Sequence, residues 1–306
     1  MKRQRGVALV IALLVTALAV LLVAALLDQG EITRARVRNG WRAEQSVQLL
    51  RGLEAWAAAG LLADQRASGA VDGLSEDWAR PMPAIELPGV RIDGRLRDLG
   101  GCFNVNALAP GGVTDPVALR RFARLLHALQ LPRELAPQAA DYIDSDAEVQ
   151  AGGAEDAAYA DGRTANTALV DIRTLRRLPA MTAAAWEALA PLLCAVPADQ
   201  PLNLNTAPAL LWQALDDAIT PAMAQRLQRG ESAMYPDLAA VRQALQREGV
   251  PSVGLAGCGV GSRYFLAEAG ILVDGIDFRY ASVLQRLPTE VRVIARMRGG
   301  DGRGRE

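Results

Sequence analysis

Residues 1–27 read MKRQRGVALVIALLVTALAVLLVAALL, and this stretch decides how the chain is built. The 21 residues that follow Gly6 carry no charge, and about 20 apolar residues are what a helix needs to cross a bilayer. The glycine precedes the apolar run, whereas a secretory signal peptide has its small-residue cleavage site behind it. The sequence therefore predicts a removable leader at residues 1–6 and a transmembrane helix at residues 7–27 that survives processing.

Basic residues, a glycine and an uncut apolar helix form the arrangement that prepilin peptidase cleaves. In this segment the chain resembles type IV pilins and the pseudopilins of type II secretion. The resemblance implies cleavage after Gly6 and methylation of the new amino group of Val7. A plain N-terminal membrane anchor is the alternative interpretation.

Ile11 occupies the fifth position after the glycine, where pilins usually carry glutamate. The resemblance implies that in a pilus this carboxylate pairs with the terminal ammonium of a neighbouring subunit, which offsets the cost of desolvating both ions. A subunit with Ile11 cannot offer this partner to a subunit ahead of it. It can still be followed by subunits that offer theirs, which is the situation at the tip of a filament.

The distribution of charge indicates where the rest of the chain lies. The formal net charge is −1, so the chain lacks the basic excess of a nucleic-acid-binding protein. The positive-inside rule places the KRQR end in the cytoplasm, although four arginines between Arg34 and Arg42 weaken the asymmetry. We expect a single pass through the inner membrane, with the C-terminal bulk in the periplasm and no nucleic acid as a partner.

The helix is predicted to continue beyond the membrane, because apolar residues recur every three to five positions from Ile32 to Trp56 without a proline. We expect it to pack on a globular domain, since an isolated stalk would leave Trp41 and Trp56 exposed. Residues 81–89, PMPAIELPG, are interpreted as a linker because of their prolines. The alternation of apolar and charged residues that follows, up to residue 106, predicts strands with one face in water.

The order of these patterns predicts the fold class. Residues 28–106 hold the helix and the first strands. Leu- and Ala-rich helical periods dominate residues 107–201, and residues 202–306 hold a second helical segment followed by strands in YFLAEAGILV and EVRVIARM. This order predicts an α+β domain interrupted by a large all-α insertion.

Two segments of the chain are similar to one another. FNVNALAP at residues 103–110 and LNLNTAPAL at residues 202–210 share an Asn-x-Asn step before a helix. Asparagine caps helices and tolerates turn backbone, so each step is predicted to end a strand and start a helix. Two such units resemble helix-hairpin-helix units, which bind nucleic acid elsewhere. The Lys and Arg cluster that this binding needs does not occur in these hairpins.

The strongest candidate for a binding site is DYIDSDAEVQAGGAEDAAY at residues 141–159. Calcium takes about six to eight oxygen ligands in irregular geometry, and clustered carboxylates on a glycine-bearing loop supply them. The candidate ligands are Asp144, Asp146, Glu148, Glu155 and Asp156. Four of them fall at EF-hand positions, but Val149 stands where that loop requires glycine. We expect a calcium site that is not an ordinary EF-hand; a solvated acidic loop is the alternative.

Cys102, Cys194 and Cys258 would meet an oxidising compartment in the periplasm, where three cysteines allow one intrachain disulfide and leave one thiol. Their spacing does not rank the three pairings. The pairing of Cys102 with Cys194 would join the two ends of the helical segment and is favoured on that ground alone. Neither a CxxC step nor a Cys/His spacing typical of zinc occurs.

Taken together, these segments resemble the type II secretion system protein K family. The leader, the span without the fifth-position glutamate, DLGGCFNVN, the acidic loop and LNLNTAPA carry the resemblance, over residues 1 to 210. It implies a pseudopilin fold, with a long N-terminal transmembrane helix and an antiparallel sheet interrupted by an α-helical insertion that binds calcium. It also implies a minor pseudopilin without enzymatic activity that caps the tip of the periplasmic filament.

The same resemblance implies the partners. Other minor pseudopilins would lie beneath the chain at the tip, and prepilin peptidase would process it in the inner membrane. Contact with secreted cargo or with the outer-membrane channel would follow from a position at the tip.

The sequence offers little for catalysis. His127 is the only histidine, and no GxSxG, HExxH or P-loop string occurs. Asp216 and Asp217 are interpreted as a solvated helix face, with a glycosidase-like acid pair as the alternative. The competing functional hypothesis is a membrane-anchored periplasmic binding protein or hydrolase that is not assembled into a filament.

Overall fold

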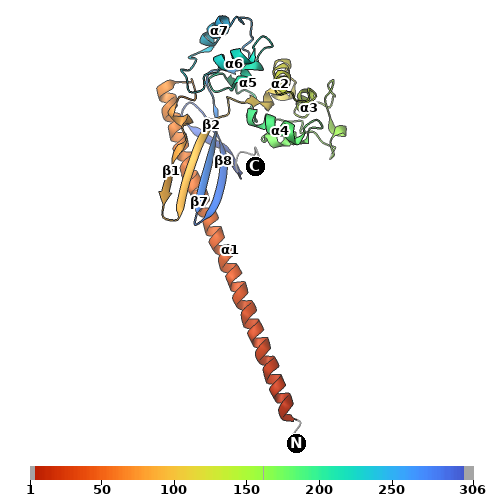
Figure 1. Ribbon diagram of the computed structural model, residues 1–306, viewed down its shortest axis with the longest axis vertical. Coiled ribbons are helices and arrows are strands. Elements are labelled where there is room, and N and C mark those ends of the chain that lie inside the picture. The colour runs from red at the N-terminus through yellow and green to blue at the C-terminus, as the bar shows by residue number, and fades with distance from the viewer. Residues whose placement is uncertain (1–3, 161, 300–306) are drawn as a thin grey trace.

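The computed structural model describes residues 4–160 and 162–299. One helix, α1, runs from Gln4 to Ser68 and projects far beyond the rest of the molecule (Figure 1). Its 65 residues correspond to a length of about 100 Å. Residues 1–3 of the predicted leader, and residues 300–306 at the end of the predicted C-terminal segment, lie outside the described residues.

The N-terminal half of α1 has the length and composition of a membrane-crossing helix. Its most apolar stretch makes no buried contact with the rest of the protein, and leucines along it, such as Leu14 and Leu21, are exposed. Among the described residues, α1 is the one helix with these properties. These properties are consistent with membrane anchoring at the N-terminal end of the chain.

The C-terminal half of α1 lies across one face of an antiparallel sheet (Figure 1). The strands follow the order β1-β2-β7-β8-β9. Their bounds are Met82–Leu87 for β1, Val90–Asp98 for β2, Tyr264–Val273 for β7, Ile276–Arg286 for β8 and Val291–Arg298 for β9. Leu50, Ala57 and Leu61 of α1 are buried against the sheet, mainly over β7, β8 and β9. The predicted long helix and antiparallel sheet are confirmed.

Polar contacts also hold α1 on the sheet. Ser46 Oγ and Tyr280 Oη lie 2.7 Å apart. Glu54 is buried, and its Oε1 accepts hydrogen bonds from Ser282 Oγ at 2.6 Å and from Arg296 Nε at 2.7 Å. Since buried polar groups stabilise a fold only when they are paired, these contacts fix the register of α1 on the sheet.

The interpretation of residues 81–89 as a linker is wrong. Most of this segment is β1, which pairs with β2 at the edge of the sheet. An edge strand tolerates Pro83, because the ladder does not require every backbone N–H there. Gly89, with φ at +74°, follows Pro88 in the turn that leads into β2, which is the order that a tight turn favours.

Trp41 and Trp56 also differ from the expectation. They are 74% and 59% exposed, although the helix does pack on the domain. The buried apolar residues of α1 are Leu50, Ala57 and Leu61, and Leu49 and Leu53 are partly buried beside them. The expectation that the globular domain covers both tryptophans is therefore wrong, because they lie away from the buried row.

The helical region between β2 and β7 lies beyond the end of the sheet, at the opposite end of the molecule from the N-terminus (Figure 1). Its helices are α2 Pro116–Ala128, α3 Leu135–Asp141, α4 Ala183–Leu189, α5 Ala209–Gln213, α6 Pro221–Leu227 and α7 Leu238–Arg247. Two parallel pairs of two-residue strands complete it: β3 Phe103–Asn104 with β4 Leu193–Cys194, and β5 Leu202–Asn203 with β6 Cys258–Gly259. The region is thus mainly rather than purely helical. One hydrophobic cluster extends from Phe103 to Cys258 and unites both predicted helical segments.

The two Asn-x-Asn steps occupy equivalent places in this region. The side chain of Asn104 accepts a hydrogen bond from the backbone N–H of Asn106, and Asn203 does the same for Asn205. The amide of the second asparagine then donates to two backbone carbonyls, in segments that lie later in the same unit. Each step begins at the last residue of a short strand, β3 or β5, and leads into the three helices that separate this strand from its partner. The sequence similarity therefore reflects a structural repeat, and we call β3 to β4 the first helical unit and β5 to β6 the second.

Cys102 and Cys194 form a disulfide, with Cα atoms 5.8 Å apart, which confirms the favoured pairing. The bridge spans 92 positions of the chain and closes the first helical unit. Its sulfurs lie in a cluster with Tyr264 and Leu266 of β7, at the junction of the helical region and the sheet. Cys258 is a free, buried thiol.

Arg286, a buried residue at the end of β8, connects three parts of the chain. Its Nη2 donates to both carboxylate oxygens of Asp72, at 2.6 and 2.7 Å, and to the carbonyl of Ser262 at 2.8 Å. Its Nη1 donates to Asp64 near the end of α1, at 3.2 Å. Asp72 is fully buried in the loop after α1. The buried guanidinium of Arg286 thus joins α1, the loop that follows it and the sheet.

Replacing Arg286 is expected to cost far more stability than replacing an exposed arginine of the same strand. Arg286→Leu leaves Asp72 and Asp64 buried without their cation, so we expect a loss of about 3–5 kcal/mol in the free energy of unfolding. Arg279→Leu is the matched control: its partners lie at the surface, and we expect a loss of about 0–1 kcal/mol. Denaturant titration of the full chain in detergent measures both, and equal losses would contradict this role of Arg286.

Stability is expected to depend on pH through Asp64. Burial and the carboxylates of Glu76 and Asp72 raise the pKa of Asp64 to about 7. The folded state therefore favours its protonated form, and this contribution to stability is full below about pH 4 and is lost as the pH rises through about 7. Asparagine at position 64 cannot ionise. The free energy of unfolding of Asp64→Asn, relative to that of the unsubstituted chain, should therefore rise by about 1–3 kcal/mol between pH 4 and pH 8. Melting curves across this range check it, and a parallel pH dependence in both proteins would contradict it.

Candidate functional site

Two groups of acidic side chains within the described residues are close enough to share a cation. One consists of Asp64, Asp72 and Glu76, and the other of Asp144, Asp146 and Glu155. In each group the nearest carboxylate oxygens all lie within 4.8 Å of one another. Like charges at such distances repel, so each group needs protons or a positive charge.

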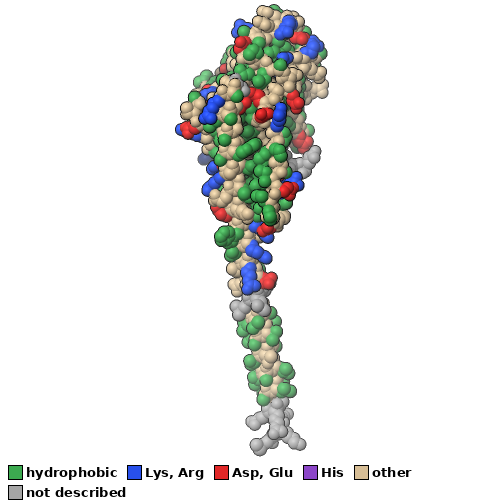
Figure 2. Space-filling view, turned by 90° about the vertical axis from the view of Figure 1, so that its left-hand side faces the viewer, with side chains coloured by type: hydrophobic (Ala, Val, Ile, Leu, Met, Phe, Trp, Pro, Cys, Tyr) green, Lys and Arg blue, Asp and Glu red, His purple; other side chains and the backbone are tan. Residues whose placement is uncertain are grey.

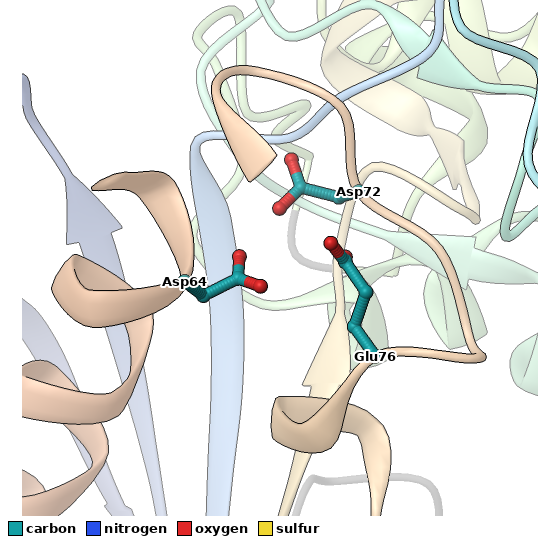
Figure 3. Close-up of side chains that lie close together, drawn as sticks. All are labelled: Asp64, Asp72 and Glu76. Atoms are coloured by element: carbon teal, nitrogen blue, oxygen red, sulfur yellow. The ribbon is translucent and has the colours of Figure 1, made fainter. Parts of the chain in front are cut away.

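The first group has its own positive charge. Asp64 comes from the end of α1, while Asp72 and Glu76 come from the loop that leads to β1, and the three side chains point toward one another (Figure 3). Arg286 donates to both aspartates. Glu76 Oε2 accepts from the backbone N–H of Gly73 at 2.9 Å and from Trp78 Nε1 at 2.8 Å. This group therefore belongs to the buried ion-pair network around Arg286 that joins α1 to the sheet.

The second group lies in the predicted acidic loop, directly after α3. Asp144 and Glu155 are only 2% and 7% exposed. Thr114 Oγ1 donates to Asp144 Oδ2 at 3.0 Å, and Thr164 Oγ1 lies 3.3 Å from Glu155 Oε2. The second oxygen of each carboxylate, Asp144 Oδ1 and Glu155 Oε1, is buried without a hydrogen-bond partner. Because an unpaired buried polar atom is costly, these two oxygens are suited to a ligand.

The pKa shifts in this second group also favour a bound cation. Burial raises the pKa of Asp144, and the charge of Asp146 raises it further. Burial also raises the pKa of Glu155, with additional contributions from Asp141 and Asp144. A cation bound between these carboxylates would favour their ionised forms and remove the repulsion.

Asp141, the last residue of α3, joins this group and was not among the predicted ligands. It is fully buried; its Oδ2 accepts from the backbone N–H of Gln150 at 3.1 Å, and its Oδ1 has no partner. A Cβ on Gly153 would lie 1.9 Å from Asp141 Oδ2, so the loop closes over this carboxylate only because residue 153 is glycine. Asp141 falls inside the stretch quoted from the sequence, but nothing local distinguishes it from a helix-surface residue.

Two of the predicted ligands lie outside the group of carboxylates. Glu148 is exposed, and its backbone N–H donates to Asp146 Oδ1 at 2.9 Å. Asp156 is exposed and accepts from the backbone N–H and the hydroxyl of Thr164, both at 2.7 Å. These two hydrogen bonds lower the pKa of Asp156. The geometry thus brings together Asp144, Asp146 and Glu155 from the predicted set, with Asp141 beside them.

The predicted processing site lies at the start of α1. Gly6 and Val7 both belong to this helix, and the side chain of Val7 is exposed. Ile11 is exposed one turn further along. At the position where pilins carry a carboxylate, α1 therefore presents an apolar side chain.

The residues considered for catalysis take part in local contacts. Asp217 accepts two hydrogen bonds from Arg124, both at 2.9 Å, and Asp216 Oδ1 accepts from the backbone N–H of Ala218 at 3.0 Å. His127 is exposed on α2. The two aspartates therefore serve the fold, as part of a surface ion pair and of a turn.

Comparison with known proteins agrees with this architecture. A family model described as type II secretion system protein K matches residues 101–198. The type II secretion system protein K of Pseudomonas aeruginosa is 31% identical over 317 residues, which cover 98% of this chain and 94% of that protein. The protein K of Pectobacterium carotovorum is 28% identical over 320 residues, with 97% of each chain covered.

A solved structure is similar over most of the chain. It is a chain in the crystal structure of the GspK-GspI-GspJ complex from the enterotoxigenic Escherichia coli type 2 secretion system, with a TM-score of 0.76 and 27% identity. The match covers 87% of this chain and 99% of that one. Sequence similarity over nearly the full length and a shared fold lead to one conclusion: the chain belongs to the type II secretion system protein K family, whose members are minor pseudopilins.

Proposed function

We propose that this chain caps the tip of the periplasmic pseudopilus of a type II secretion system and supports protein secretion across the outer membrane. The observation that carries the proposal is the place of the helical region, which lies beyond the end of the sheet and furthest from the N-terminus (Figure 1). A further subunit stacked in this direction would meet the bulk of α2 to α7. The filament would therefore extend only from the opposite end.

Two further observations support the position at the tip. Ile11 gives the chain no carboxylate for the terminal ammonium of a subunit ahead of it. The similar solved chain belongs to a complex of GspK with GspI and GspJ, and we propose corresponding minor pseudopilins as the partners of this chain. They would lie beneath it in the filament.

The helix α1 and the disulfide support our proposal for the location and processing of the chain. We propose a single pass through the inner membrane, cleavage by prepilin peptidase after Gly6 and methylation of Val7. The disulfide between Cys102 and Cys194 fits an oxidising compartment, so the C-terminal bulk would lie in the periplasm. The role is structural: the chain assembles and contacts cargo or the outer-membrane channel, and performs no chemical step itself.

We also propose that the acidic loop binds calcium. Buried carboxylate oxygens without partners, on Asp141, Asp144 and Glu155, are hard donors of the kind that calcium prefers. Asp146 adds a fourth carboxylate at the exposed side. Calcium would fix the loop of residues 141–159 against the first helical unit by supplying the positive charge that these side chains need.

The N-terminus of the chain isolated from membranes tests the processing. Intact mass and N-terminal sequencing should show a start at N-methylated Val7. Gly6→Leu should leave the chain starting at Met1 and should abolish secretion by a strain that depends on this gene, because prepilin peptidase requires a small residue at the cleavage site. A native chain that starts at Met1 and still supports secretion would favour the alternative of an unassembled membrane-anchored protein.

Calorimetric titration of the full chain in detergent tests the metal. Asp144→Ala and Glu155→Ala should each lower the calcium affinity at least about tenfold, since removal of one carboxylate ligand from a site of this kind costs more than about 1.4 kcal/mol. Glu148→Ala is the matched control, and its affinity should stay within about twofold, because this exposed side chain lies outside the group. Unchanged affinity in both ligand variants would refute the site.

A further inference from the structure

The end of α1 and the loop that follows it face one another through the carboxyl groups of Asp64 and Glu76 (Figure 3). The nearest oxygens of these two groups and of Asp72 all lie within 4.8 Å of one another. Glu76 Oε2 accepts hydrogen bonds from the backbone N–H of Gly73 and from Trp78 Nε1. Glu76 Oε1 is buried and has no hydrogen-bond partner among the described residues. A buried acceptor therefore lies close to a second carboxyl group.

A proton on Asp64 supplies the donor that Glu76 Oε1 needs. Two ionised carboxylates at this distance repel one another, whereas the O–H of a protonated carboxyl donates to a neighbouring carboxylate. Burial and the negative charges of Glu76 and Asp72 raise the pKa of Asp64 to about 7, and a side-chain hydrogen bond with Glu76 raises it further. In the folded chain, Asp64 is therefore mainly protonated below about pH 7.

The other charges around Asp64 leave this repulsion in place. Arg286 of β8 donates to Asp64 through Nη1 at 3.2 Å, but its Nη2 donates to Asp72. The charge of Arg286 lowers the pKa of Asp64 without cancelling the rise. The further charged side chains that line the groove beside α1 are paired among themselves or with the sheet: Glu54 with Arg296, Arg95 with Glu268, and Asp77 with Arg80.

Solvent reaches the two carboxyl groups through this groove. The groove has a volume of about 620 Å³, and both Asp64 and Glu76 line it. Figure 2 shows hydrophobic side chains gathered along this face of the molecule. Water in the groove can take up the proton of Asp64, so the ionisation of this residue follows the pH of the solution.

The loop is held on both sides of Glu76. Asp72 is fully buried, and its carbonyl accepts from Asn203 Nδ2 of the second helical unit at 3.1 Å. Trp78 is buried, with its ring packed edge-on against a phenylalanine of β7 at a centroid distance of 5.2 Å. Residues 73–77 lie between these two anchors. Repulsion between Asp64 and Glu76 would therefore act on this short segment and not on the whole domain.

We propose that residues 73–77 form a latch on the end of α1 that pH opens and closes. In the closed state, protonated Asp64 donates a hydrogen bond to Glu76 Oε1. When Asp64 loses its proton to water in the groove, the two carboxylates repel one another and the segment is released from α1. This inference goes beyond the proposed function and does not depend on it. In the periplasm, the latch would make the junction between α1 and the second helical unit respond to the pH of that compartment.

Hydrogen exchange of the full chain in detergent, read by mass spectrometry at pH 5 and pH 8, tests the latch. After correction for the intrinsic exchange rates, protection of the peptide that holds residues 73–77 should be at least about tenfold lower at pH 8, because Asp64 ionises between these values. Protection of α4, in the first helical unit, should change less than about twofold. Equal protection of residues 73–77 at both pH values would overturn the proposal.

Two variants should hold the latch closed at both pH values. The side-chain amide in Asp64→Asn donates to Glu76 Oε1 whatever the pH, and the amide in Glu76→Gln donates to ionised Asp64. Each should keep the protection at pH 8 within about twofold of that at pH 5. Asp77→Asn is the matched control, because this neighbouring carboxylate is exposed, and it should retain the drop of at least about tenfold. A drop that persists in either folded latch variant would overturn the proposal.

Discussion

The buried contact between Arg286 and Asp72 holds together parts of the molecule that lie far apart in the sequence. Arg286 belongs to the sheet, and Asp72 to the loop that follows α1. Asp72 also accepts from the backbone N–H of Ser262, and its carbonyl accepts from Asn203 Nδ2, so the second helical unit meets at the same point. A buried ion of this kind is tolerated only with all of its partners in place. The orientation of the helical region relative to α1 depends on this contact.

The orientation of the helical region matters because, in the proposed cap, the bulk of this region blocks the addition of a further subunit. The rod formed by α1 projects from one end of the molecule, and the helices occupy the other (Figure 1). The disulfide between Cys102 and Cys194 closes the first helical unit where it meets the sheet. The acidic loop belongs to the same helical unit, so the cation that we propose there would add a second constraint on this unit.

Local patterns predicted much of this architecture. The apolar run after Gly6 and the acidic loop were visible in short stretches of sequence, whereas the preference for Cys102 with Cys194 rested on the order of the predicted segments. The edge strand β1, within residues 81–89, was missed because prolines favour a linker unless the strand lies at an edge, and position in a sheet is not a local property. Asp141 and the pairing of Arg286 with Asp72 could not be predicted, because each depends on residues that only the fold brings together.

The central claim is that one copy of this chain ends the filament. Electron microscopy of isolated pseudopili, with a gold label on the helical region of the full-length chain, tests it most directly. The account predicts a single label at one end of each filament. Labels repeated along the shaft, with further subunits stacked beyond the labelled copy, would contradict it.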